Sequence, residues 1–123
     1  MNKYIILYLV LIVFFISACL HSPVISPNQP EVSFKNDVQP IMIGNCTSSG
    51  CHGTSSGGEG IFSLMTYDDV INNGGINSGK PEKSKLYKAI TSKGENLMPP
   101  NGKMADQLIL KIYDWIGQGA KNN

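Results

Sequence analysis

The residues best suited to chemistry in this chain of 123 residues lie in one short stretch, from Cys46 to His52. Two cysteines are followed at once by a histidine in the segment Cys46-Thr47-Ser48-Ser49-Gly50-Cys51-His52. That order is typical of covalent c-type haem attachment, which is normally written C-x-x-C-H. Each thiol adds across a vinyl group of the haem, and the histidine next to the second cysteine is thereby placed under the iron as its proximal ligand. Here four residues separate the cysteines, and the extra small polar residues can loop out without moving the Cys51-His52 pair.

Three other interpretations of these residues remain open. Cys46 and Cys51 could form a disulfide in an oxidising compartment. They could bind zinc or copper, although zinc needs a further ligand and the only other histidine is His21. A thioredoxin-type redox pair is disfavoured because it expects two intervening residues and a strand-to-helix setting. The adjacent His52 places haem ahead of all three.

A haem iron takes a sixth ligand, and methionines are the candidates once His21 is discounted as a residue of a linker. Met98 stands out because the two prolines that follow it hold the backbone extended and away from any helix. It lies 46 residues after His52, a reach suited to wrapping around a porphyrin. Met104 is the second candidate. Met42 falls on the apolar stripe of an expected helix and is interpreted as a core residue, the commonest role of a methionine.

Residues 1–18 are interpreted as a bacterial export signal. Lys3 precedes an apolar run of thirteen residues, Tyr4 to Ile16. That run is shorter than the roughly 20 residues that cross a bilayer, and it fits the apolar part of a signal peptide, about 7–15 residues long. The tetrapeptide Ile16-Ser17-Ala18-Cys19 resembles the lipobox of bacterial lipoproteins, in which the cysteine is diacylated; an ordinary secretory signal with an incidental cysteine is the alternative. Residues 19–31 are proline-rich and predict an extended spacer.

We therefore expect a lipid-anchored protein of the bacterial cell envelope, tethered to a bilayer through Cys19, with its domain in the periplasm or at the outer surface.

Residues 32–123 predict a single all-α domain of about four short helices, because their apolar residues recur at helical intervals. The first helix begins either with Asp37 as N-cap and Pro40 in its first turn or at Ser33 with a kink at Pro40, and it ends near Gly44 or Asn45. Three further helices are expected. The second helix follows the capping box Thr66-Tyr67-Asp68-Asp69, and the third runs from Pro81 to Gly94. The fourth carries an apolar stripe of Leu108, Ile112, Trp115 and Ile116.

The core of this domain is expected to be thin. Between Gly44 and Gly75, 8 of 32 residues are glycine, so this third of the domain offers few side chains for packing. Small domains of this kind usually recruit disulfides, metals or another prosthetic group. The sequence therefore leaves room for a haem as part of the interior.

The chain resembles the small monohaem c-type cytochrome domains of exported bacterial proteins, including the planctomycete-type cytochrome c domains. The segments that carry the resemblance, in chain order, are Phe34 to Ile41, Cys51-His52-Gly53, Ser84 to Ile90, Met98-Pro99-Pro100 and Asp114 to Ala120. The resemblance implies a cytochrome c fold around one covalent haem c, with Cys46 and Cys51 as thioether sites, His52 as proximal ligand and Met98 as distal ligand. The four-residue cysteine spacing departs from the commonest pattern.

The expected function is electron transfer, because two protein ligands on the iron leave no open position for substrate. Histidine with methionine raises the reduction potential, and burial of the haem by Phe34, Leu97, Ile112 and Trp115 is expected to raise it further. The alternatives are a haem enzyme or gas sensor with a displaceable Met98, and a haem-free lipoprotein with a Cys46–Cys51 disulfide.

The charge pattern limits the possible partners. The net charge is +1, 15% of residues are charged, and all ten basic residues are lysine, so a nucleic-acid partner is not expected. Residues 80–93 hold five lysines and one acid, a local charge of 5 − 1 = +4. This segment could steer an acidic redox partner, and its alternative is an ordinary solvated helix face. We expect the protein to be a monomer.

Overall fold

The computed structural model describes residues 29–48, 50–53 and 62–123, and within these residues the chain is helical and contains no strand. The elements are η1 (Phe34–Val38, a π-helix), α2 (Gln39–Cys46), α3 (Tyr67–Asn73), the 3₁₀ turn η2 (Pro81–Lys83), α4 (Lys85–Thr91), the 3₁₀ turn η3 (Gly94–Asn96) and α5 (Asp106–Gly117). The prediction of an all-α domain with about four short helices is confirmed. The signal segment, Cys19 and His21 lie outside the described residues. No helix within them combines the length and hydropathy that a bilayer-spanning segment needs.

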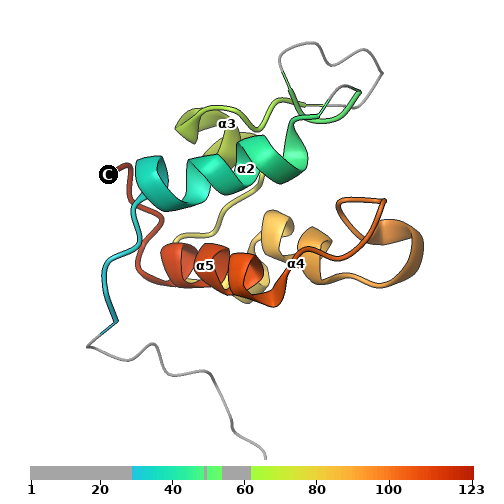
Figure 1. Ribbon diagram of the computed structural model, residues 1–123. Helices are drawn as coiled ribbons and strands as arrows, with labels where there is room; N and C mark the ends of the chain where they lie inside the picture. Colours follow the sequence, from blue (N-terminus) through green and yellow to red (C-terminus); the bar gives the residue numbers. More distant parts are fainter. Residues whose placement is uncertain (1–28, 49, 54–61) are drawn as a thin grey trace, which may run out of the picture.

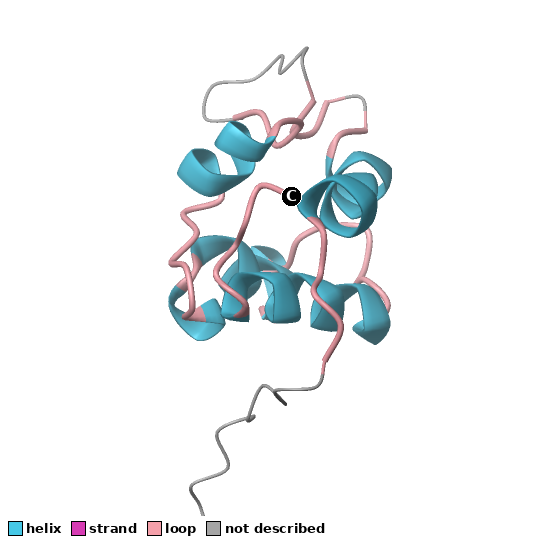
Figure 2. Ribbon diagram, turned by 90° about the vertical axis from the view of Figure 1, so that its left-hand side faces the viewer, coloured by secondary structure: helices cyan, strands magenta, loops and turns pink. Residues whose placement is uncertain are grey.

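The helices are arranged in two groups around a shared core. Figures 1 and 2 show α2 and α3 on one side of the molecule and α4 and α5 on the other, and α5 packs against both α4 and η1. The largest fully buried side chains are Trp115, Met42, Ile90, Ile112, Ile116, Val38 and Val70. The core therefore joins residues from every α-helix.

Each of the two expected starts is confirmed in one part: Ser33 is the N-cap of η1, as one had it, and Pro40 lies in the first turn of α2, as the other had it. An N-cap at Asp37 is wrong, because Val38 precedes α2. The Ser33 hydroxyl accepts a hydrogen bond from the backbone N–H of Asn36 (3.1 Å), and the Asp37 carboxylate accepts one from the N–H of Ser33 (2.8 Å). The next turn is a π-turn, in which the N–H of Val38 reaches back to the carbonyl of Ser33. This wider turn runs directly into α2 and places Pro40 in the first turn of that helix, where its missing N–H costs little.

The capping box before α3 is confirmed. The Thr66 hydroxyl accepts from the N–H of Asp69, and the Asp69 carboxylate accepts from the N–H of Thr66, both at 3.1 Å. The Ser63 hydroxyl also donates to Asp69 (2.8 Å), and this bond together with those from Thr66 lowers the pKa of the carboxyl. The helix ends at Gly74 and Gly75, as predicted, with Gly75 at a φ of +55°.

The predicted helix from Pro81 to Gly94 is wrong as a single element. Ser84 separates η2 from α4, because its fully buried hydroxyl accepts from the N–H of Asn77 (2.8 Å) and donates to the carbonyl of Lys80 (3.2 Å). α4 then ends at Thr91, and Gly94 begins η3 instead of closing the helix. A buried side-chain hydrogen bond has overridden the helical pattern here.

The last helix is confirmed, with one shift in its buried face. Ile112, Trp115 and Ile116 are buried as expected, whereas Leu108 is half-buried and Ile109 takes its place in the core. Positions 109, 112 and 116 are spaced i, i+3 and i+7, so they form a regular helical stripe. The helix as a whole packs against η1, η2 and α4.

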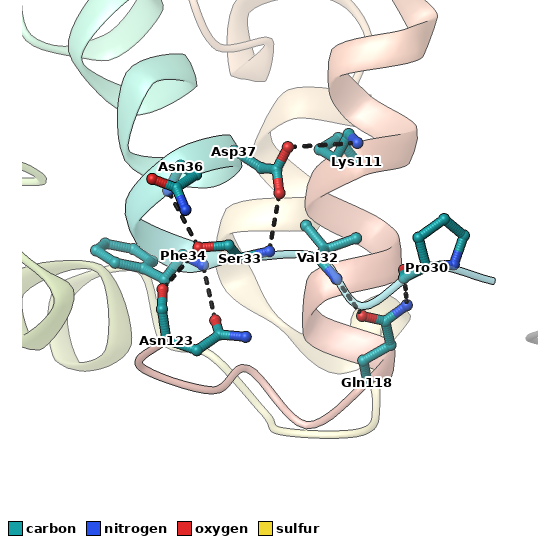
Figure 3. A network of polar contacts seen from close by, with 9 residues as sticks. All are labelled: Pro30, Val32, Ser33, Phe34, Asn36, Asp37, Lys111, Gln118 and Asn123. Atoms are coloured by element: carbon teal, nitrogen blue, oxygen red, sulfur yellow. Dashed lines mark hydrogen bonds and ion pairs between the residues drawn. The ribbon is translucent and has the colours of Figure 1, made fainter.

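The two ends of the described chain are joined by hydrogen bonds and one ion pair that we call the terminal clamp, formed by residues 30–37 with Lys111, Gln118 and Asn123 (Figure 3). The side chain of Gln118 accepts from the N–H of Val32 (2.8 Å) and donates to the carbonyl of Pro30 (3.1 Å). The Asn123 side chain accepts from the N–H of Phe34 (2.9 Å). The segment before η1 is therefore fastened to the end of α5.

Candidate functional site

A single cavity brings together the residues that the sequence analysis selected. Its volume is about 590 Å³, within the range of roughly 300–1,000 Å³ that small-molecule and cofactor sites occupy. Cys46, Cys51, His52 and Met98 all line it, although they come from the end of α2, the turn after it and the segment after η3. In Figure 1 these elements lie on the side of the molecule away from the C-terminus. Met104, the second candidate ligand, does not line the cavity and is buried in the core.

The turn between the cysteines closes on itself. The N–H of His52 donates to the carbonyl of Cys46, and the N–H of Cys51 donates to the carbonyl of Ser48, both at 2.8 Å. These bonds return the chain to the end of α2 immediately after the turn. The wider cysteine spacing therefore does not carry His52 away from Cys46.

His52 is held by backbone groups of the segment that follows the glycine-rich stretch. Its Nδ1 lies 2.8 Å from the carbonyl oxygen of Phe62, and its own carbonyl accepts from the N–H of Leu64 (2.9 Å). The Phe62 ring packs against the imidazole with centroids 4.7 Å apart. Because a carbonyl oxygen can only accept, this contact selects the neutral tautomer with its proton on Nδ1, in which Nε2 has a lone pair for a metal. Sequence reasoning missed Phe62, since a backbone acceptor ten residues away leaves no signal in residue type.

The two thiols of the cavity are free of disulfides. Burial, and secondarily the neighbouring Cys51, raise the pKa of Cys46 to about 11, so this thiol is neutral at pH 7. Disulfide exchange proceeds through the thiolate, so this shift disfavours exchange at Cys46. Within residues 29–48, 50–53 and 62–123, moreover, no three His, Cys, Asp or Glu side chains gather as a metal site.

Met98 is presented to the cavity by a segment anchored on α4. Its N–H donates to the carbonyl of Ala89 (3.0 Å), and the peptide bond between Met98 and Pro99 is cis. The side chain is 38% exposed, in contrast to Met104 at 5%. Met42 is fully buried in the core, where the sequence analysis placed it.

The apolar walls of the cavity differ from those expected. Phe34, Ile112 and Trp115 are buried but do not line it, because the rings of Phe34 and Trp115 pack on each other and on Tyr67 in the core. Leu97 does not line it either. The apolar walls come instead from Phe62, Leu64, Leu86, Ala89 and Ile90.

The helical fold and the donor set resemble those of a cytochrome c-like domain. In agreement, residues 49–102 match the family model described as Planctomycete cytochrome C. The matched segment contains Cys51, His52 and Met98 and begins three residues after Cys46. No curated protein and no solved structure matches the chain.

This family implies a haem cofactor, and the residues of the cavity fit one. An imidazole with a free Nε2, a thioether sulfur and two thiols share a space with apolar walls. Imidazole and thioether are the ligands that cytochromes c use on iron, and thiols are the groups that join haem to protein.

Proposed function

We propose that this protein is an electron-transfer monohaem cytochrome c, with its haem bound covalently to Cys46 and Cys51 and ligated by His52 and Met98. The observation that carries the proposal is that these four residues, spread over more than fifty positions, line the same cavity. In this assignment the domain carries electrons and is not an enzyme.

The chain's own residues prepare the site for that role. When bound, the haem supplies a one-electron couple between ferric and ferrous iron. The Phe62 carbonyl orients His52, and the bond to Ala89 holds the backbone of Met98, so both axial donors are positioned by backbone hydrogen bonds. Leu64, Leu86 and Ile90 keep the cavity apolar, which together with histidine–methionine ligation favours the ferrous state and a higher potential.

A pyridine haemochrome spectrum of protein made with haem-maturation machinery tests the attachment, because its band position reports the number of thioethers. We expect two thioethers in the unmodified protein and one in each of the variants Cys46→Ala and Cys51→Ala. The haem should also resist extraction with acidified acetone. A colourless purified protein would contradict the proposal and favour the disulfide-containing lipoprotein.

The exposure of Met98 favours a second candidate, a haem enzyme or gas sensor whose distal ligand is displaced. A side chain that is 38% exposed, on a segment without α-helix, is easier to move than one locked in the core. Carbon monoxide binding separates the two functions. Slow or negligible binding to the ferrous protein at neutral pH fits an electron carrier, whereas rapid binding favours the enzyme or sensor.

We further propose that the protein is anchored to a membrane of the bacterial cell envelope through acylated Cys19. The lipobox-like tetrapeptide Ile16-Ser17-Ala18-Cys19 supports this assignment. Phase partition in a detergent that clouds on warming is a direct test. The full-length protein should enter the detergent phase, and Cys19→Ser should leave it in water; equal partition of the two would remove the lipid anchor.

We define residues 80–93 as the lysine segment. We propose that the redox partner uses its own acidic residues to dock on this segment. Its five lysines are exposed, and Lys85 among them also lines the cavity. Long-range attraction of this kind raises association rates and weakens with salt. The electron-transfer rate should fall with ionic strength, and Lys88→Glu should reduce it more than the same charge change at Lys35, which lies on η1. A flat salt dependence would remove the docking surface.

A further inference from the structure

The charged side chains around the cavity are few and opposite in sign. Besides the titratable groups of Cys46, Cys51 and His52, the described residues that line it include one base, Lys85, and one acid, Glu95. The chain has no arginine, so lysine is the only fixed cation it can offer. A haem brings two propionate carboxylates, and an anion at a partly closed site is costly unless it is paired.

The stem of Lys85 lies against the backbone of Gly75. A Cβ atom at Gly75 would lie 2.8 Å from Cδ and 2.9 Å from Cγ of Lys85, so the lysine stem rests directly on the bare glycine. The N–H of Lys85 also donates to the carbonyl of Gly75 (3.1 Å). The φ of +55° at Gly75 is a conformation that favours glycine. The junction between α3 and α4 thus supports the apolar stem of a lysine at the cavity wall.

The ammonium group of Lys85 has no ion-pair partner in the described part of the chain. The three ion pairs found there join Lys103 to Asp106, Lys111 to Asp37 and Lys121 to Glu31. Two of the three asparagine side chains that line the cavity already donate a hydrogen bond, whereas none from Asn96 is found within the described residues. Asn45 donates to the carbonyl of Ile41 and Asn73 to that of Ser63, both at 2.9 Å.

We propose that Lys85 binds a propionate of the haem and keeps that carboxylate ionised, an inference that rests on the haem site proposed above. Glu95, of opposite charge, repels the propionates, so the two residues together select which edge of the haem lies toward the junction of α3 and α4. The ligand class is an alkyl carboxylate, and the bond is a charge-assisted hydrogen bond from an ammonium. Lys85 is a binding and positioning residue, because it does not touch the iron.

The test is the reduction potential of the haem-loaded protein as a function of pH. An ionised propionate stabilises ferric iron, so the potential falls as pH rises through the propionate pKa and is flat above it. Loss of an opposite charge within 4–6 Å raises a carboxyl pKa by about 1–3 units. Lys85→Gln should therefore move the sloping region upward by about 1 pH unit or more. Lys85→Arg should leave it near its original position.

The matched control is Lys88→Gln, which removes the same charge from an exposed position of α4 that does not line the cavity. A profile that moves in Lys85→Gln and stays in Lys88→Gln supports the propionate contact. If the pH profile of the potential moves equally in both variants, the effect is one of general surface charge and the inference is overturned. An unchanged profile in Lys85→Gln would overturn it as well. Each outcome is read only from coloured, haem-loaded protein, so failure of the haem proposal itself is recognised separately by its absent spectrum.

Discussion

The hydroxyl of Tyr113 on α5 donates a 2.6 Å hydrogen bond to the carboxylate of Glu82 on η2. Burial of the ring is the main cause, and the bond to Glu82 the second, of a Tyr113 pKa that rises to about 12. The same bond lowers the pKa of Glu82. The Tyr113 ring also packs on Tyr87 of α4, with centroids 5.2 Å apart. These two contacts tie η2 and α4 to α5.

The raised pKa of Tyr113 predicts a loss of stability in alkali. A group whose pKa is raised from 10 to about 12 on folding contributes stability that is complete below pH 10 and is lost as pH rises toward 12. Ring-labelled tyrosine followed by NMR should show Tyr113 as a late-ionising phenol. Glu82→Gln should lower that pKa but keep it above 10, since burial remains. Urea unfolding of Tyr113→Phe should depend less on pH in this window; identical alkaline profiles for variant and parent would refute the assignment.

Replacing the proximal ligand His52 should vacate one coordination position of the iron, and added imidazole should fill that position again. His52→Gly removes the imidazole that the Phe62 carbonyl orients, so the haem-loaded variant should lose its low-spin spectrum. Free imidazole added to the solution should restore it, because the cavity left by the side chain accepts the same donor. Absorption and electron paramagnetic resonance spectra measure both steps. A low-spin spectrum that survives the substitution without imidazole would show that another residue is the ligand.

A pair of variants decides between the two candidate distal ligands, Met98 and Met104. Met98→Ala should abolish the weak sulfur-to-iron absorption near the red end of the spectrum, since Met98 lines the cavity. Met104→Ala should keep that band, but should lower the free energy of unfolding by about 2–5 kcal/mol through the space left in the core. Retention of the band in Met98→Ala together with its loss in Met104→Ala would reverse the assignment.

Substitutions at two glycines separate the cost of backbone strain from the cost of a steric clash. Gly75 and Gly79 both have positive φ, +55° and +75°, but a Cβ atom would meet Lys85 only at Gly75 and nothing within 4 Å at Gly79. Gly79→Ala should cost about 1 kcal/mol of unfolding free energy from strain alone. Gly75→Ala should cost more, and Lys85→Ala should relieve part of the difference. Denaturant unfolding of the singles and the double measures this coupling, and strictly additive values would mean that the lysine stem is not in contact.

The sequence predicted the elements whose signals are local. The Thr66 capping box, the stripe on α5 and the start at Ser33 all depend on neighbouring residues, and each is confirmed. Cys46, Cys51, His52 and Met98 were selected because their chemistry is specific, and the structure places them around one cavity.

What the sequence could not predict depends on contacts between distant residues. The interruption at Ser84 arises from a buried hydroxyl bonded to Asn77, seven positions earlier. The support of His52 comes from a backbone carbonyl, which every residue type carries. The cavity walls were misassigned because Phe34 and Trp115 are as apolar as Leu86 and Ile90, and only the packing decides which pair faces the cavity.

The terminal clamp and the cavity lie at opposite ends of the first helical segment. The rod formed by η1 and α2, from Phe34 to Cys46, is roughly 20 Å long. The clamp lies at its first end and the cavity at its last, and neither residues 29–44 nor residues 101–123 line the cavity (Figure 1). The backbone that enters the domain at Pro30 is therefore about one rod length away from the cavity and leaves the cavity mouth uncovered.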